Sequence, residues 1–437
     1  MIKPNTLVLA KDQYYSLDCY ETQLNNNVLV VGSAGCGKTR HIVVPNILQA
    51  VGSYIISDPK GNLYKLYGNY LRKKGYTVKK IDFEKPDKSS RYNFFEYIRS
   101  EQDIIKLAHM LIFSDNNKTS FADPYWDNSA EQLLSAMIAF LMESRPKEEQ
   151  NLSCLIKCLA ALQEDENGSR RTPIDMLMKE HERRNKNSFA VKQYNQFMVA
   201  PIKTKMCTVT TVLSKFGIYN TEEITKMTSQ NDIDIASIGK KKTAVFVVVS
   251  DHERSMDMLA NVFYSQAMSE LCDYADHHCK DNKLPVDVRF ILDDFATNCV
   301  ICDFPRMISS IRSRGISTML MIQAESQLDH SYGKNSSTII ANCDTYVYMG
   351  GNDIDTAYSV ARRCDVPVKK ILYMPIGTNW IFRRGQYPIN AENIDHEEFV
   401  DEKLKEIMSS MNNSENNTKS SNGRRLKNDN CEIETEK

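Results

Sequence analysis

The chain reads VLVVGSAGCGKT from Val28 to Thr39, a short β-branched run followed by a GxxxxGK[ST] pattern, and the next residues, RHIVVPNILQ, are compatible with a helix. In such a unit the backbone N–H groups at the helix start surround phosphate oxygens, Lys38 meets the β and γ phosphates, and the Thr39 hydroxyl binds magnesium. The alternative is a glycine-rich turn that contains Lys38 by chance. We predict a nucleotide-binding loop made of Gly32, Ser33, Ala34, Gly35, Cys36, Gly37, Lys38 and Thr39.

A second segment supplies carboxylates of the kind that this loop requires. VRFILDD, residues 288–294, is an apolar strand that ends in two aspartates. A phosphate-binding loop needs an acidic residue on another strand to hold magnesium, and a group that orients the attacking water. We expect Asp293 to join Thr39 at the metal and Asp294 to act as the catalytic base. The alternative is a strand that simply ends in solvated aspartates.

Strand and helix patterns alternate along much of the chain. Apolar runs separated by helix-like segments are typical of parallel strands with crossover helices. Later runs are apolar throughout, which indicates strands buried on both faces of a sheet. Between the strands predicted before residue 100 and those predicted after residue 200, apolar residues recur at the three- and four-residue spacing of helices. The predicted strands are 28–31, 54–57, 77–82, 244–250, 288–293, 318–323 and 345–350.

These patterns predict an α/β protein with a mostly parallel central sheet and an inserted all-alpha domain. We place the first part of the nucleotide-binding domain at 1–100, the insertion at 101–200 and the second part of the nucleotide-binding domain at 201–400. Residues 401–437 are rich in Ser, Asn, Lys and Glu, too polar to form a packed core. We expect a disordered tail there.

The composition excludes several classes of protein. The 437 residues include 55 Lys or Arg and 56 Asp or Glu, so a formal net charge of −1 excludes a generally basic nucleic-acid coat and an acidic disordered tail protein. The longest strongly apolar stretch, Leu133–Met142, has about half of the ~20 residues that a membrane-spanning helix needs. We expect no membrane span. The 12 cysteines without a secretion signal indicate reduced thiols in a cytosolic protein.

Two groups of cysteine and histidine residues raise the question of a metal site. Cys299 and Cys302 form a CxxC pair without a second pair, and the other group lies in a helix-like run without the usual ligand spacing. We therefore favour buried thiols and solvated imidazoles over a metal site in both segments. The second group consists of Cys272, His277, His278 and Cys279.

Taken together, these motifs resemble the TraG/TraD-type coupling proteins of type IV secretion and conjugation. The order and spacing of the motifs match over residues 28–384. The segments that carry the resemblance are GSAGCGKT, SYIISDPKGNLY at 53–64, DPYWDNSAEQLLSA at 123–136, DDFATNCVICDFPRMISSIRSRGISTMLMIQAESQLDHSYG at 293–333 and TIIANCDTYVYMGGNDIDTA at 338–357.

The resemblance implies a RecA-like P-loop ATPase domain that uses ATP and Mg²⁺ and carries an inserted all-alpha domain. Proteins of this kind are hexameric rings at the inner face of the cell membrane. They pass single-stranded DNA with its bound relaxase, or effector proteins, to the type IV secretion channel. The partners implied are therefore relaxase-bound DNA, the channel proteins and further copies of this chain, in the cytoplasm against the membrane.

The resemblance also implies roles for residues outside the two nucleotide motifs. Arg312 matches the arginine that a neighbouring subunit contributes to stabilise charge on the transferred phosphoryl group, with Arg314 as a substitute. Gln323 matches a strand-end glutamine that contacts the γ phosphate or the attacking water. The segment containing Asp58, Lys60 and Gly61 closes another strand, and we expect it to shape the subunit contact or the central channel.

The chain departs from the family pattern in three places. The usual glutamate after the metal-side aspartate is Asp294, one methylene shorter, which can slow hydrolysis by misplacing the carboxylate. The usual glycine and proline that follow are replaced by Cys299 and Cys302. The two N-terminal membrane helices are missing, since only 31 mainly polar residues precede Gly32. The chain is then a soluble member that reaches the membrane through a partner protein, or its reading frame begins late.

Contact with DNA has no strong local signature in the sequence. Basic stretches occur at 72–74, 180–186 and 240–242, although such stretches are commonly solvated faces. A six-fold ring multiplies any inward-facing basic residue, so a near-neutral subunit is compatible with a positive channel. Two other functions stay open, a chromosome-type translocase of double-stranded DNA and a nucleotide-gated docking receptor with little ATP turnover. The polar tail after Asp401 disfavours the first, and Asp294 leaves room for the second.

Overall fold

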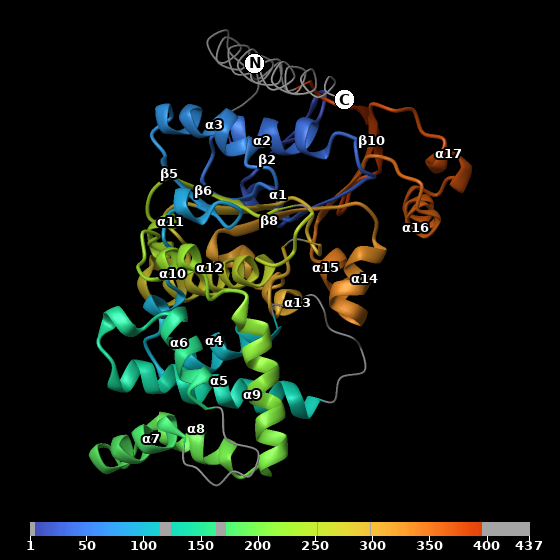
Figure 1. Ribbon diagram of the computed structural model, residues 1–437. Helices are drawn as coiled ribbons and strands as arrows, with labels where there is room; N and C mark the ends of the chain where they lie inside the picture. Colours follow the sequence, from blue (N-terminus) through green and yellow to red (C-terminus); the bar gives the residue numbers. More distant parts are fainter. Residues whose placement is uncertain (1–4, 114–123, 163–171, 251, 298, 396–437) are drawn as a thin grey trace, which may run out of the picture.

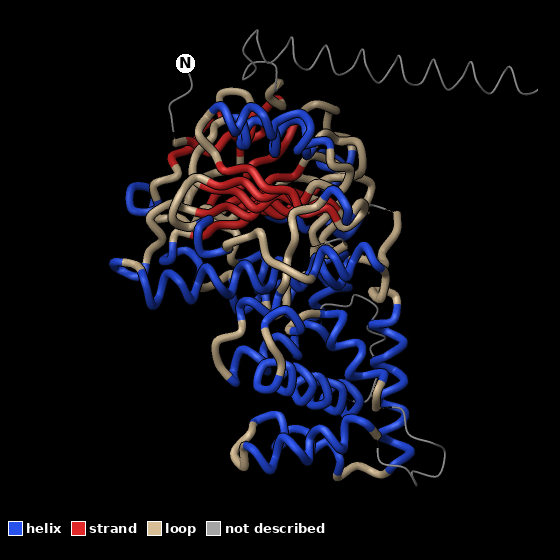
Figure 2. The backbone as a smooth tube through the Cα atoms, turned by 60° about the vertical axis from the view of Figure 1, so that its left-hand side comes forward, coloured by secondary structure: helices blue, strands red, loops and turns tan. Residues whose placement is uncertain are grey.

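The fold is an α/β domain around one large sheet, with a block of helices attached below it (Figure 1). A computed structural model describes residues 5–113, 124–162, 172–250, 252–297 and 299–395. The predicted tail at 401–437 lies outside these residues. The view in Figure 2 shows the sheet in the upper body, between helices above and below, and the helical block beneath it.

The central sheet has nine strands, and its seven neighbouring strands from β9 to β5 are all parallel. β10 and β11 extend this sheet with antiparallel pairing. The strand order is β11 (Ile389–Glu392), β10 (Thr378–Arg383), β9 (Thr345–Tyr348), β3 (Val28–Val31), β8 (Ile316–Ile322), β7 (Val288–Leu292), β4 (Ser53–Ser57), β6 (Thr243–Val248) and β5 (Thr77–Asp82). β1 (Thr6–Ala10) and β2 (Gln13–Ser16) form a separate hairpin. The predicted mostly parallel sheet is confirmed.

Both faces of the sheet are covered, which explains its continuous apolar strands. Along β3, Val28 and Val30 belong to one core, whereas Leu29 and Val31 belong to the other. This alternation follows from the two-residue period of a strand. The first core includes residues of α2 (Val44–Leu48) and α3 (Asn62–Lys73), and the second includes residues of α12 (Asp257–His278).

A helical block separates β5 from β6 in the chain. No strand lies between these two among the residues that the structure describes there. Helical structure continues past residue 200, and α9 packs against α5 and α6. These contacts favour a boundary later than the one at residue 200, because α9 belongs with the helical block. The block contains α4 (Glu101–Phe113), α5 (Pro124–Ser144), α6 (Leu152–Ala160), α7 (Pro173–Arg184), α8 (Phe189–Met198), α9 (Ile202–Gly217) and α10 (Glu222–Thr228).

Shorter helices connect the remaining strands. They are α1 (Cys19–Thr22), α11 (Ile235–Ile238), α13 (Phe304–Met307), α14 (Ser326–Tyr332), α15 (Ser336–Ala341), α16 (Ile354–Cys364) and α17 (Val368–Leu372). Two further turns matter below, η1 (Thr39–Val43), which continues into α2, and η6 (Ile311–Arg314), which precedes β8. In the described part of the chain, none of the helices has the length and hydrophobicity needed to cross a bilayer.

Candidate nucleotide-binding site

The loop from Gly32 to Thr39 connects β3 to η1 at the carboxyl edge of the sheet. Its backbone is tied to both neighbouring strands, because the Gly32 N–H donates to the Ile322 carbonyl at 3.1 Å and the Ser33 N–H donates to the Gly350 carbonyl at 2.9 Å. Gly37 has φ of 89°, and a Cβ atom there would lie 2.3 Å from the His41 ring. Glycine is therefore required at this turn.

The Lys38 ammonium lies inside the curve of this loop. Its Nζ donates to the Gly32 carbonyl at 2.6 Å and to the Ser33 carbonyl at 3.2 Å, and the residue is only 8% exposed. Two backbone carbonyls thus hold the ammonium inside the loop that the sequence motif predicts to surround phosphate oxygens. The third donor of the ammonium is left for a ligand in the loop.

The loop and the β7 carboxylate meet directly, as predicted from their places at strand ends. Thr39 Oγ1 donates to Asp293 Oδ2 at 2.7 Å, although β8 lies between β3 and β7 in the sheet. Burial raises the pKa of the Asp293 carboxyl, and the hydrogen bond from Thr39 and the charge of Lys38 oppose that rise. The structure therefore brings an ammonium, a hydroxyl and a carboxylate into one cluster.

The remaining carboxylate, Asp294, lies next to this cluster in a sharp turn. Its φ of 52° is left-handed, a conformation that aspartate adopts more readily than most residues. Its backbone N–H donates to Asp293 Oδ1 at 3.1 Å. The half-exposed side chain of Asp294 is accessible to water at the carboxyl edge, and its role as a base stays a prediction.

Gln323 also lies at the carboxyl edge, directly after β8. Because β8 lies between β3 and β7, this residue follows the strand that separates the loop from Asp293. Its side chain is exposed, and its backbone N–H donates to Gln327 Oε1 at 2.8 Å. Gln323 thus lies at the same edge of the sheet as the loop and Asp293, and its contact with nucleotide stays a prediction.

Two supports of Asp293 were missed by sequence reasoning. The Asp293 carbonyl accepts a hydrogen bond from Ser57 Oγ at 3.2 Å and a weaker one from the Cys299 thiol at 3.6 Å. Burial raises the pKa of Cys299 to about 12, so this residue acts as a neutral donor rather than a reactive thiolate. Every cysteine in the described part of the chain is a free thiol.

The segment after β4 has a structural role that the sequence did not reveal. The buried Asp58 carboxylate accepts from the Leu63 N–H at 3.1 Å and from the Tyr64 N–H at 2.8 Å. It therefore satisfies backbone donors at the start of α3, as a capping side chain does. A role of this segment in the subunit contact or the central channel stays a prediction.

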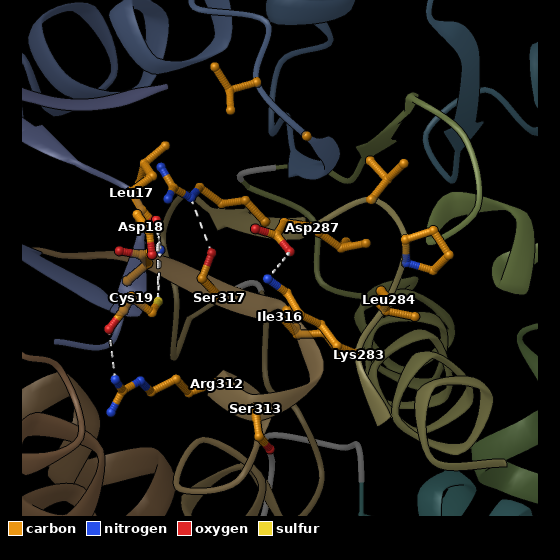
Figure 3. A pocket seen from close by; sticks show the side chains of 18 of the residues that line it. Leu17, Asp18, Cys19, Lys283, Leu284, Asp287, Arg312, Ser313, Ile316 and Ser317 are labelled. Carbon is orange, nitrogen blue, oxygen red and sulfur yellow. Dashed lines mark hydrogen bonds and ion pairs between the residues drawn. The ribbon is translucent and has the colours of Figure 1, made fainter. Parts of the chain in front are cut away.

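The two candidate arginines lie at the opposite, amino edge of the sheet. Arg312, in η6, lines an open pocket of about 1070 Å³ at the start of β7 and β8 (Figure 3). Its side chain is exposed and donates to the Cys19 carbonyl at 2.9 Å. Arg314 instead forms a paired contact with Asp276 at 2.8 and 2.7 Å. Arg314 is thus engaged by a carboxylate, whereas the guanidinium of Arg312 lies toward an open pocket.

Solved structures with the same fold include conjugative coupling proteins. The bacterial conjugative coupling protein TrwB, in a trigonal form with sulphate, matches with a TM-score of 0.67 and 16% identity over 89% of each chain. TrwB in complex with ADP and Mg²⁺ matches with a TM-score of 0.65, at 16% identity and 89% of each chain. VirB4 of Thermoanaerobacter pseudethanolicus matches with a TM-score of 0.54 and 12% identity, over 92% of this chain and 97% of that one. These likenesses confirm the RecA-like α/β fold.

The sequence itself matches a protein family over most of its length. No curated protein matches this sequence at a significant level. The family described as type IV secretory system conjugative DNA transfer matches residues 1–365, which is most of the chain. This match confirms the resemblance found in the motifs: the chain belongs to the conjugative DNA transfer family of the type IV secretory system.

Proposed function

We propose that this chain is a coupling ATPase, which binds and hydrolyses ATP in order to recruit conjugative DNA and its attached protein to the type IV secretion channel. The observation that carries the proposal is the hydrogen bond of 2.7 Å between Thr39 and Asp293. It joins the loop to the carboxylate that such an ATPase needs. Family membership and the TrwB structures solved with ADPNP and with ADP and Mg²⁺ support the same reading.

The residues present fit the cofactor that the proposal requires. Thr39 and Asp293 offer a hydroxyl and a carboxylate, the hard oxygen ligands that magnesium prefers, and these oxygens already converge. Bound magnesium would neutralise charge on the phosphate oxygens during their transfer. Lys38 and the backbone N–H groups of the loop would bind the phosphates of ATP and fix their position.

Hydrolysis then requires a water and a neighbouring subunit. Asp294 would orient the water and accept its proton as the new P–O bond forms and ADP leaves, while Gln323 would contact the γ phosphate or that water. Arg312 of a second copy would stabilise the charge that develops. The chain would therefore work as a homo-hexamer, with nucleotide bound between subunits.

The proposed partners follow from family membership. They are single-stranded DNA with a bound relaxase and the proteins of the type IV secretion channel. We propose that the ring works in the cytoplasm at the inner face of the cell membrane. In a ring, basic residues repeat around the axis, so the formal charge of −1 per chain is compatible with a DNA channel.

An ATPase assay with and without single-stranded DNA tests the proposal. The unmodified chain should hydrolyse ATP and respond to DNA, whereas Lys38→Ala should abolish turnover and Asp294→Ala should lower it strongly. Light scattering on the same samples should report a hexamer in at least one nucleotide condition. A chain that assembles and binds nucleotide without any turnover would exclude the motor, and a monomer in every condition would exclude the shared site.

A nucleotide-gated receptor is the second candidate, and Asp294 is the observation that favours it. The aspartate is shorter than the glutamate of the family pattern and lies in a left-handed turn with φ of 52°. A carboxylate set back from the water would leave binding intact and slow hydrolysis. The assay above separates the two functions, because a receptor changes its binding of DNA or channel proteins with nucleotide but turns over little ATP.

A further inference from the structure

A second cluster of ligating side chains lies away from the nucleotide site, where the helical block meets the segment that follows Asp294. His109 comes from α4, and Cys302 and Asp303 come from the turn before α13. One ligating atom from each of the three lies within 4.8 Å of the other two. His109 is far from Cys302 and Asp303 in sequence, so only the fold brings it to them.

The histidine of this cluster is oriented by a fourth residue. His109 Nδ1 lies 3.2 Å from Glu131 Oε2 of α5, with the two side chains 34% and 22% exposed. The His109 ring also hydrogen-bonds Cys302, so with Nδ1 directed to Glu131 the other ring nitrogen, Nε2, is left for the thiol or for an ion beside it. Metal-binding histidines characteristically donate their other ring N–H to a carboxylate in this way. Glu131 thus supplies an independent observation that points to a ligand at Nε2.

The turn that carries the other two ligands is itself held in place. The Cys302 backbone N–H donates to Ser265 Oγ of α12 at 2.9 Å. Asp303 has a left-handed φ of 54°, and it directly precedes α13. Cys302 is half-buried and Asp303 is exposed, so an ion could enter from solvent on the side of Asp303.

We propose that His109, Cys302 and Asp303 form a zinc site that links the helical block to the segment after the nucleotide carboxylates. A thiolate, an imidazole and a carboxylate are the donors that zinc takes, with bonds of about 2.0–2.3 Å. Tetrahedral geometry at those bond lengths places donor atoms about 3.5 Å apart, so the three side chains need to approach by about 1 Å. The soft thiolate separates this site from Thr39 and Asp293, whose oxygen donors suit magnesium.

The site differs from the CxxC pair that the sequence contains. Cys299 points its thiol to the Asp293 carbonyl at 3.6 Å, while Cys302 faces α4. The two cysteines therefore serve different neighbours. With three protein ligands, the fourth zinc position is left for water. A bound ion would tie α4 to the turn eight residues after Asp294.

Metal binding by the full-length protein tests this proposal. The purified chain, stripped with chelator and titrated with zinc, should bind one equivalent of zinc. Cys302→Ser and His109→Gln should each lower the affinity for zinc by at least a hundredfold. Glu131→Gln should lower the affinity for zinc by about 10- to 100-fold, as expected for a carboxylate that orients a metal-binding histidine. Cys207→Ser removes an exposed thiol of α9 and is the matched control, with unchanged affinity.

Cobalt titration provides a readout that is independent of affinity. Co²⁺ in the site should give a thiolate-to-metal absorption band that Cys302→Ser abolishes and Cys207→Ser retains. Circular dichroism and nucleotide binding of each variant verify folding. Absence of zinc binding by the unmodified chain would overturn the proposal, and so would binding that persists in both Cys302→Ser and His109→Gln.

Discussion

The two edges of the central sheet carry the residues for which we propose catalytic roles. At the carboxyl edge, Lys38, Thr39 and Asp293 already contact each other or the loop. At the amino edge, Arg312 is exposed and donates to the Cys19 carbonyl. The seven residues of β8 separate the two edges, about 20 Å at roughly 3.3 Å per residue. Arg312 is therefore too far from the loop of its own chain, and only a second copy could bring it there.

Lys38→Ala should have the largest effect, because it removes the only side-chain cation in the loop. We expect turnover to fall at least a thousandfold and nucleotide affinity to fall with it, on the scale of lost charge stabilisation at a transferred phosphoryl group. Assays of ATPase rate and of fluorescent nucleotide binding check both. Lys226→Ala, at an exposed position of α10, is the control. Tight nucleotide binding by Lys38→Ala would break the assignment of the carboxyl edge.

Arg312→Ala should lower turnover by about a thousandfold while nucleotide affinity stays nearly unchanged, since a neighbour's arginine acts on the charge of the transition state. Arg314→Ala is the matched comparison. Its guanidinium is paired with Asp276, so its loss should cost about 1 kcal/mol of stability or less and spare turnover. Steady-state kinetics and thermal unfolding of both variants check this. The reverse pattern would make Arg314 the active residue of the amino edge.

Asp294→Glu should raise turnover by as much as tenfold, because the longer side chain brings the carboxylate about 1 Å closer to the water. Asp294→Asn should lower turnover by about a hundredfold, since it removes the base. Single-turnover hydrolysis measures the chemical step in both. If both variants match the unmodified chain, Asp294 takes no part in hydrolysis at the carboxyl edge.

The smallest expected effect is on stability without nucleotide, where Asp293→Asn should be slightly more stable than the unmodified chain. Burial raises the pKa of Asp293, so the folded state disfavours the charged form above the pKa of the unfolded chain. At neutral pH the neutral amide should raise the unfolding midpoint by about 2 °C. This advantage should shrink as the pH falls through the raised pKa, where Asp293 is protonated in the unmodified chain. Thermal unfolding at several pH values checks it, and a lower midpoint at neutral pH would contradict it.

Local patterns in the sequence predict most of the carboxyl edge. The GxxxxGK[ST] loop and the strand that ends at Asp293 have strong local signals, and parallel strands bring their carboxyl ends together. The contact between Thr39 and Asp293 follows from these two facts. The amino edge is different, because Arg312 is recognised only through the family resemblance, and its partner Cys19 lies 293 residues away in the chain.

The features that sequence reasoning missed share a physical cause. The hydrogen bond from Cys299 to the Asp293 carbonyl depends on how the loop turns back, and the capping of α3 by Asp58 depends on a turn of five residues. The helical block continues through α9, whose packing against α5 and α6 cannot be told from packing on a sheet by periodicity alone. The path of a turn and the choice of which helices pack together leave no periodic pattern in the sequence.

Mixing two inactive variants tests the division between the edges most directly. Lys38→Ala supplies an intact Arg312, and Arg312→Ala supplies an intact loop, so rings that contain both have complete sites between unlike subunits. The account predicts that each variant alone is inactive and that ATPase activity returns when the two are co-assembled. Activity that stays at the level of the separate variants in co-assembled rings would contradict a nucleotide site shared between copies.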